Sequence, residues 1–123
     1  MKIFGVGTDI VKTNRIQKLL RRKNVLEKLF NKEEISKCKR IKKMTNCFAK
    51  RFAAKEAIMK SLGKGWRQIN WKDIEITGGG KPEVILYGKA KELAKQMNIF
   101  NIHISLSHEE DKAIAFAISE LEK

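Results

Sequence analysis

Residues 51–65 read RFAAKEAIMKSLGKG, and this stretch decides which fold the rest of the chain builds. Its alanine, lysine, glutamate and methionine content favours a helix, and Gly63 is a typical residue to end one. Extended back to residue 46, the helix carries an apolar stripe made of Phe48, Phe52, Met59 and Leu62. Glu56 lies beside this stripe and Lys60 one turn further on. Such a pair usually adds only roughly 0.2–0.5 kcal/mol to a helix, so the rest of the chain must show whether it has a chemical role.

Alternating residues predict the sheet against which this helix packs. In KAIAFAI (112–118) every residue on one face is alanine, and in NIHISLS (101–107) the apolar residues also share one face. An all-alanine face lets another backbone approach closely, and the alanine-rich helix is the natural candidate. Other segments predict a buried strand at 2–11, strands at 73–77 and 82–87, and short helices at about 14–20, 25–30, 32–41 and 88–97, the first capped by Thr13 or Asn14. We therefore expect one α+β domain over residues 1–123, an antiparallel sheet packed on one long helix plus short helices.

The composition narrows the classes of partner and the compartment. Lysine and arginine number 27 against 14 acidic residues, a net charge of +13, which favours an anionic partner such as nucleic acid, a phosphorylated cofactor, anionic lipid or an acidic protein. No apolar run is long enough for a membrane span, and the first residues are too quickly polar for a signal peptide. Cys38 and Cys47 lack metal-site spacing, so we expect two reduced thiols in a cytoplasmic protein, not a zinc site or a disulfide.

Two glycine-containing motifs suggest nucleotide sites, and both fail. GVGTDI (5–10) lacks a third glycine, and no helix opens directly on its turn, which excludes the dinucleotide-binding fingerprint. GGGKP (78–82) has proline where a phosphate-binding P-loop needs serine or threonine after its lysine. A glycine-rich turn is the simpler interpretation of this second motif.

Three titratable residues are more informative together than alone. Asp9 and His108 end two strands, while Glu56 lies on the helix that we expect to cross the sheet. Two carboxylates from separate segments suit Mg²⁺, which binds one or two carboxylates, keeps several waters and shares substrate phosphates. Lys60 and Lys64, with His108, are placed to meet the remaining phosphate charge. A lone histidine is more often structural, and we assign His103 to that class.

The chain resembles the holo-acyl-carrier-protein synthase family of 4′-phosphopantetheinyl transferases. The likeness is carried by GVGTDIVKTNRI, FAKRFAAKEAIMKSLGKG, GGGKPEV and ISLSHEEDKAIAFAI, in that order, and it extends over nearly the whole chain. The resemblance implies the 4′-phosphopantetheinyl transferase fold and a Mg²⁺-dependent reaction that serves fatty acid biosynthesis. Coenzyme A would donate its 4′-phosphopantetheine arm to a serine hydroxyl of apo-acyl carrier protein, with release of 3′,5′-ADP. It also implies a trimer with active sites between subunits.

The resemblance also assigns roles to individual residues. Asp9 and Glu56 match the metal ligands, with Glu56 as a general base, a metal ligand or both, and Lys60 and His108 match residues that meet the phosphates. Positions matched to coenzyme A binding are Arg51, Gly63, Gly65, Gly80, Lys81 and Pro82, with His108 among them. Arg15, Lys18 and Arg22 form a basic stripe that, with Arg21, would attract the acidic carrier protein.

Two other classes of protein compete with this interpretation. A basic, non-enzymatic nucleic-acid-binding module would explain the charge, but the sequence has no RNP-type aromatic pattern, GXXG loop or zinc-knuckle spacing. Such a module would also leave Asp9 and Glu56 unexplained. A membrane-surface protein would need a helix with a bulky apolar face opposite its lysines, which the chain lacks. We therefore expect neither nucleic acid nor a stable membrane association among the partners.

Overall fold

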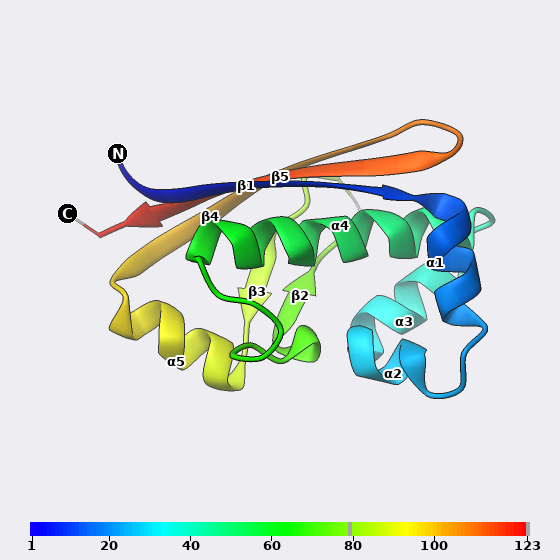
Figure 1. Cartoon of the computed structure of the whole chain (residues 1–123), viewed down its shortest axis with the longest axis horizontal. Coiled ribbons are helices and arrows are strands. Elements are labelled where there is room, and N and C mark those ends of the chain that lie inside the picture. The colour runs from blue at the N-terminus through cyan, green and yellow to red at the C-terminus, as the bar shows by residue number, and fades with distance from the viewer. Residues whose placement is uncertain (79, 123) are drawn as a thin grey trace.

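The computed structural model describes residues 1–78 and 80–122. Along the chain the elements are β1 (Lys2–Lys12), α1 (Thr13–Leu20), α2 (Val25–Leu29), α3 (Lys32–Lys39), α4 (Met44–Leu62), the 3₁₀ helix η1 (Trp71–Asp73), β2 (Ile74–Ile76), β3 (Val84–Leu86), α5 (Gly88–Gln96), β4 (Ile99–His108) and β5 (Lys112–Leu121). Three strands form an antiparallel sheet in the order β1–β5–β4, and β2 pairs with β3 separately. Figure 1 shows α4 running along one face of the larger sheet, with α1, α2 and α3 near one end of α4 and α5 near the other. The α+β prediction is confirmed.

Small residues let α4 lie directly on the sheet. Ala113, Ala115 and Ala117 of β5 are completely buried beneath the helix, as their shared face predicts. On β1 the same role falls to Gly7, where a Cβ would collide with the carbonyl oxygen of Ala57. Gly5 is equally constrained, because a Cβ there would collide with the carbonyl oxygen of Ser61. Backbone packed against backbone in this way fixes the position of every side chain on α4 relative to β1.

The core surrounds α4, which is the longest helix at 19 residues. The predicted stripe of Phe48, Phe52, Met59 and Leu62 is buried. Ile58 is also buried, because the sheet covers one side of α4 while α1, α3 and β2 pack against the others. Gly63 ends the helix with a φ of 68°, as expected. Within residues 1–78 and 80–122, no helix has the length and apolar character to cross a bilayer.

The outer face of the larger sheet is uncovered and apolar. Val6 and Ile10 of β1 are 55% and 59% exposed, and Ile114 and Phe116 of β5 are 42% and 39% exposed. The prediction of a buried strand at 2–11 is therefore right about the strand and wrong about its burial. The physical reason is that α4 covers only one face of the sheet, so every second residue of β1 points away from the core.

Two local predictions are wrong. Neither Thr13 nor Asn14 caps α1: the residue before the helix is Lys12, and no side chain caps its first turn. Cys38 and Cys47 are not separate thiols but form a disulfide, with Cα atoms 5.4 Å apart. The fold explains this, because Cys38 on the buried face of α3 meets Cys47 in the first turns of α4. Disulfides are rare in the cytosol, and the cytoplasmic location stays a prediction.

Candidate active site

The first candidate group of residues lies where α4 crosses β1. Lys60 Nζ donates hydrogen bonds to the Thr8 carbonyl oxygen at 2.8 Å and to Asp9 Oδ1 at 3.3 Å. The Asp9 side chain is 16% exposed and that of Lys60 is 54% exposed, so the pair opens to solvent on the lysine side. Glu56 precedes Lys60 by one helical turn and is half-buried. The predicted association of Asp9, Glu56 and Lys60 therefore exists in three dimensions.

The structure disfavours the charged form of both carboxyl groups in this acid–lysine group, Asp9 and Glu56. Burial raises the pKa of Asp9, partly offset by its hydrogen bond to Lys60. Burial also raises the pKa of Glu56, and the negative charge of Asp9 raises it further. Arg15 lowers both pKa values, which places its guanidinium within electrostatic range of the site. A cation that bridged Asp9 and Glu56 would relieve this repulsion.

The donor set fits magnesium. No group of three or more His, Cys, Asp and Glu side chains suited to a metal gathers anywhere in residues 1–78 and 80–122. The acid–lysine group offers two carboxylates. Mg²⁺ commonly uses one or two protein carboxylates and keeps waters and phosphate oxygens as its other ligands. Asp9 and Glu56 are therefore sufficient for a shared protein–substrate magnesium site.

A small pocket adjoins Glu56 and Lys60. Its volume is about 320 Å³, and its lining includes the predicted residues Gly63, Lys64 and Gly65. Because the chain turns at Gly63 in the left-handed region, the backbone leaves the helix beside the pocket instead of crossing it. The pocket is also bordered by Trp66, which the sequence analysis did not identify.

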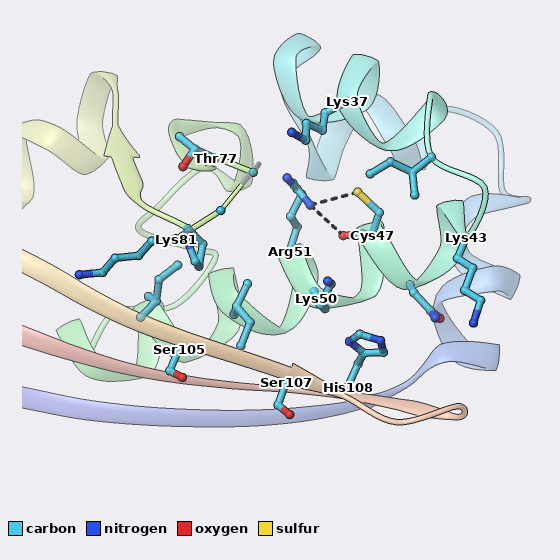
Figure 2. Close-up of a pocket in the computed structure, with 17 residues that line it drawn as sticks. Lys37, Lys43, Cys47, Lys50, Arg51, Thr77, Lys81, Ser105, Ser107 and His108 are labelled. Carbon is cyan, nitrogen blue, oxygen red and sulfur yellow. Dashed lines mark hydrogen bonds between the residues drawn. The ribbon is translucent and has the colours of Figure 1, made fainter.

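The second candidate group lines a larger cavity of about 900 Å³ between α3, the start of α4, β4 and the turn before β3. The residues predicted to bind coenzyme A that line it are Arg51, Gly80, Lys81, Pro82 and His108. Gly79, the middle glycine of the GGGKP motif, lies outside the described residues. Three lysines that the sequence analysis missed, Lys37, Lys43 and Lys50, also line the cavity (Figure 2). No Asp or Glu is among the described lining residues, so this basic cavity suits a polyanion.

Arg51 is the most constrained cation of the basic cavity. Its side chain is almost fully buried, and Nη1 donates to the Cys47 carbonyl oxygen at 3.3 Å and contacts Cys47 Sγ at 3.0 Å. Its Nε has no hydrogen-bond partner among the described residues. Gly78 makes room for the guanidinium, because a Cβ there would come within 2.6 Å of Nη2. Burial lowers the pKa of Arg51, partly offset by Glu34 and Glu75. An incompletely satisfied arginine at a cavity wall is well suited to an anionic ligand.

The acid–lysine group and the basic cavity lie on opposite sides of α4. Arg51 and Lys60 are nine residues apart on the helix, which is a rotation of about 180° at 100° per residue. Asp9 and His108 belong to β1 and β4, the two outer strands of the larger sheet. The expectation that His108 joins Asp9 and Glu56 is therefore wrong within one chain, because the helix stands between them. A helical-wheel comparison of Arg51 with Lys60 would have indicated this separation.

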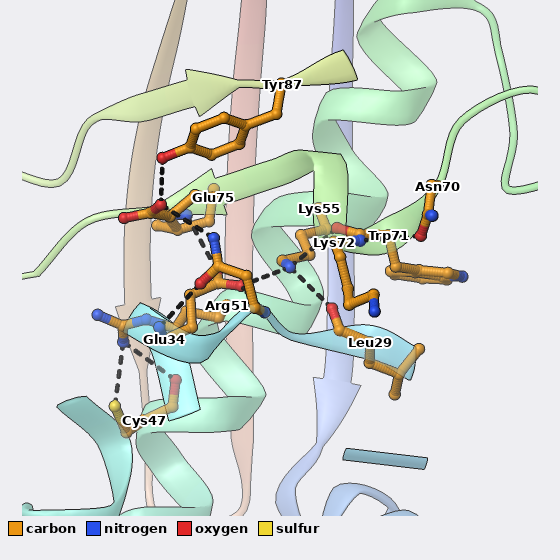
Figure 3. Close-up of polar contacts among 12 residues, drawn as sticks. Leu29, Glu34, Cys47, Arg51, Lys55, Asn70, Trp71, Lys72, Glu75 and Tyr87 are labelled. Atoms are coloured by element: carbon orange, nitrogen blue, oxygen red, sulfur yellow. Dashed lines mark hydrogen bonds and ion pairs between the residues drawn. The ribbon is translucent and has the colours of Figure 1, made fainter. Parts of the chain in front are cut away.

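A buried polar network holds the helices that frame both groups, and the sequence analysis did not predict it. Lys55 Nζ lies 2.6 Å from Glu34 Oε1, and both side chains are fully buried. The lysine also donates to the carbonyl oxygens of Leu29 and Trp71, while Glu34 accepts from the Ile76 amide (Figure 3). The network therefore joins α2, α3, α4, η1 and β2. Desolvation lowers the pKa of Lys55, and the negative charge of Glu34 offsets part of that shift.

The predicted basic stripe begins on the exposed side of α1 and continues past its end at Leu20, where Arg22 lies. Arg15, Lys18 and Arg22 are exposed, while Ile16 anchors the helix in the core. The Arg15 guanidinium lies over the Phe52 ring, 5.7 Å from its centroid. Arg15 therefore connects the stripe to the helix that carries Glu56.

Three comparisons with known proteins show the family to which the chain belongs. The model of the 4′-phosphopantetheinyl transferase superfamily matches residues 5–117. A curated relative from Clostridium kluyveri, named holo-[acyl-carrier-protein] synthase, is 47% identical over 98% of this chain and 92% of its own length.

Solved structures give the same result at the level of the fold. The acyl carrier protein synthase of Plasmodium yoelii with ADP bound is 38% identical, with a TM-score of 0.88 over 98% of this chain and 97% of that one. The holo-(acyl-carrier-protein) synthase of Bacillus anthracis in complex with CoA (3′,5′-ADP) is 31% identical, with a TM-score of 0.82 over 99% of this chain and 100% of that one. The resemblance stated from the sequence blocks is confirmed.

Proposed function

Since the chain belongs to the 4′-phosphopantetheinyl transferase superfamily and is an enzyme of the holo-[acyl-carrier-protein] synthase type, we propose that it transfers 4′-phosphopantetheine from coenzyme A to acyl carrier protein. The serine hydroxyl oxygen of the carrier attacks the phosphorus that bears the pantetheine arm. The bond from that phosphorus to the bridging oxygen breaks, and 3′,5′-ADP leaves with the bond's electrons. One observation carries the proposal: the basic cavity suits the nucleotide end of this substrate, and the two-carboxylate site suits a metal ion on its pyrophosphate.

We assign the residues of the acid–lysine group to the chemistry. Asp9 and Glu56 would hold Mg²⁺, which neutralises charge on the pyrophosphate when it is bound. Glu56 accepts the serine proton, directly or through water. Lys60 is exposed enough to turn from Asp9 towards a phosphate oxygen. Phosphoryl transfer depends mainly on this kind of positioning and charge neutralisation.

The basic cavity takes the nucleotide end of coenzyme A in this proposal. Arg51 and His108 meet the phosphates, and Gly80, Lys81 and Pro82 line the space for the nucleotide. Its three additional lysines strengthen the attraction for a molecule with several phosphate charges.

Because the two groups face away from each other, we propose that one active site combines the acid–lysine group of one copy with the basic cavity of a neighbouring copy. A closed trimer would give three such sites. The uncovered apolar face of the larger sheet, with Ile10 and Phe116, supports an assembly, since exposed patches of this kind often mark interfaces between chains. Sedimentation equilibrium checks this: three chains per particle are expected, and a fully active monomer would contradict it.

A mass spectrum tests the activity directly. Apo-acyl carrier protein incubated with the enzyme, coenzyme A and Mg²⁺ should gain the mass of phosphopantetheine. A carrier whose acceptor serine is replaced by alanine is the control and should gain nothing. If the carrier stays unmodified while an oligonucleotide binds tightly, the proposal fails in favour of a nucleic-acid-binding module. We place the reaction in the cytoplasm and in fatty acid biosynthesis, and cell fractionation together with loss of fatty acid synthesis on depletion would check both.

A further inference from the structure

A third basic surface is distinct from the α1 stripe and from the basic cavity. It is a groove of about 510 Å³ between α2, the segment after α4, η1 and α5. Four cations line it, Lys28, Arg67, Lys72 and Lys89, and no Asp or Glu is among its described lining residues. Both tryptophans of the chain, Trp66 and Trp71, also line it. The groove therefore combines positive charge with aromatic surface.

Trp66 connects this tryptophan groove to the candidate active site. Its side chain is 62% exposed, and the Arg67 guanidinium lies over its ring, 5.4 Å from the centroid. The same tryptophan borders the small pocket that holds Glu56 and Lys60. A ligand in the groove would thus lie next to the residues assigned to proton transfer and phosphate charge. Exposed tryptophan and arginine side chains are also the types most enriched among the anchors of protein interfaces.

Trp71 connects the groove to α1. Its ring stacks on Phe52 with centroids 5.1 Å apart and planes 13° from parallel. The Arg15 guanidinium lies over the same phenylalanine. The buried Phe52 ring therefore links the basic stripe of α1 to the tryptophan groove by contacts on both sides.

We propose that the tryptophan groove is a second docking site for the acidic carrier protein, used together with the α1 stripe. The inference rests on the proposed function, because it requires a protein whose serine reaches Glu56. An acidic protein matches the cation-rich lining, and one of its apolar side chains would fit beside Trp66 and Trp71. The groove's opening next to Glu56 favours this partner over a nucleic acid.

Charge reversal tests the groove by kinetics. The double variant Lys72→Glu/Lys89→Glu should raise the KM for carrier protein about tenfold at low salt, because each exposed charge contact is worth up to about a fivefold change. The KM for coenzyme A should not change, since the basic cavity is intact. The matched control Lys91→Glu/Lys95→Glu makes the same charge change at exposed positions of α5 outside the groove, and it should shift the carrier KM less than about twofold.

Tryptophan fluorescence tests occupancy without turnover. Both tryptophans lie in the groove, so binding of a tryptophan-free carrier protein with alanine at its acceptor serine should change the emission. Trp66→Phe should remove most of that change while leaving the carrier mass gain measurable.

The outcomes are separable. If the wild-type enzyme modifies the carrier but the groove variant behaves like its control, or the emission stays constant at saturating carrier, the groove proposal is overturned alone. If the wild type modifies no carrier, the proposed function fails and the docking proposal with it. Emission that responds to a single-stranded oligonucleotide at lower concentration than to the carrier would also overturn it.

Discussion

Two lysines of α4 each pair with a carboxylate from another element, and the burial of each pair indicates whether its role is structural or functional. Lys55 and Glu34 meet at 2.6 Å with both side chains completely buried, whereas Lys60 and Asp9 meet at 3.3 Å with the lysine 54% exposed. The two lysines are five residues apart on the helix, so they point about 140° away from each other. The buried ammonium donates its three hydrogen bonds to protein acceptors. The exposed one retains solvent access, so it can exchange Asp9 for a phosphate oxygen.

The largest predicted effect is on stability, from the buried pair. Lys55→Met leaves the Glu34 carboxylate buried without its cation, and the free energy of unfolding should fall by about 3–5 kcal/mol. Lys60→Met is the matched control, and its stability should stay within about 0.5 kcal/mol of wild type. Urea denaturation at a fixed protein concentration measures both. Equal stability of the two variants would contradict the claim that the buried pair contributes more to folding than the exposed pair.

The next effect is on turnover, from the exposed pair. In the proposed mechanism the Lys60 charge stabilises the transition state. By analogy with deletion of an oxyanion-hole donor, its removal in Lys60→Met should cost about 2.7–4 kcal/mol, or a 10²–10³-fold fall in kcat. Magnesium binding should be kept, because both carboxylates remain. Turnover across a magnesium titration measures the effect. A variant that regained full activity at high magnesium would show that Lys60 acts only through the metal site.

A smaller effect is expected on the pKa of Glu56, which depends on the charge of Asp9. The Asp9 charge raises the pKa of Glu56, so Asp9→Asn should lower that pKa towards its ordinary range. In the wild type, Glu56 should become protonated at a higher pH than an ordinary glutamate. Because a protonated carboxyl does not bind magnesium, metal affinity should weaken as the pH falls. Carbon NMR of the Glu56 carboxyl in metal-free protein measures the pKa. An unchanged value in Asp9→Asn would mean that the two carboxyls do not interact.

The smallest effect is expected on the α1 stripe. Lys18→Glu should raise the KM for carrier protein up to about fivefold and leave kcat unchanged, with the defect shrinking as salt is added. Arg15→Glu should raise the same KM but also lower kcat, because Arg15 lies within electrostatic range of Asp9 and Glu56. Steady-state kinetics at two salt concentrations separates the residues. Identical kcat values in both variants would show that the Arg15 charge does not act on Asp9 and Glu56.

Much of the fold could be predicted because its periodic patterns were strong. The alanines at 113, 115 and 117 identified the strand under α4, and Gly63 identified the helix end. The position of Lys55 in the core was not predicted, because a lysine beside a glutamate on a helix usually lies at the surface. Only the packing of α2, α3 and η1 against α4 supplies the acceptors that make burial possible.

The candidate site was predicted in its parts but not in its arrangement. Asp9, Glu56 and Lys60 lie together because β1 and α4 pack against each other, whereas His108 lines the basic cavity instead. Three lysines of the basic cavity were not predicted: they come from α3, from the residue before α4 and from α4 itself, and no sequence pattern distinguished them among so many scattered lysines. The Cys38–Cys47 disulfide was missed for a related reason, since contacts between α3 and α4 decide it and not spacing along the chain.

The central claim is that one active site is built from two copies of the chain, and mixed assemblies test it most directly. Glu56→Gln inactivates the acid–lysine group and Arg51→Met disables the basic cavity while keeping most of the buried side-chain volume. Each variant alone should be nearly inactive. Co-expressed in equal amounts, they should recover about one quarter of wild-type turnover, because one random interface in four then pairs an intact group with an intact cavity. No recovery, in mixed assemblies verified by two affinity tags, would contradict the shared site.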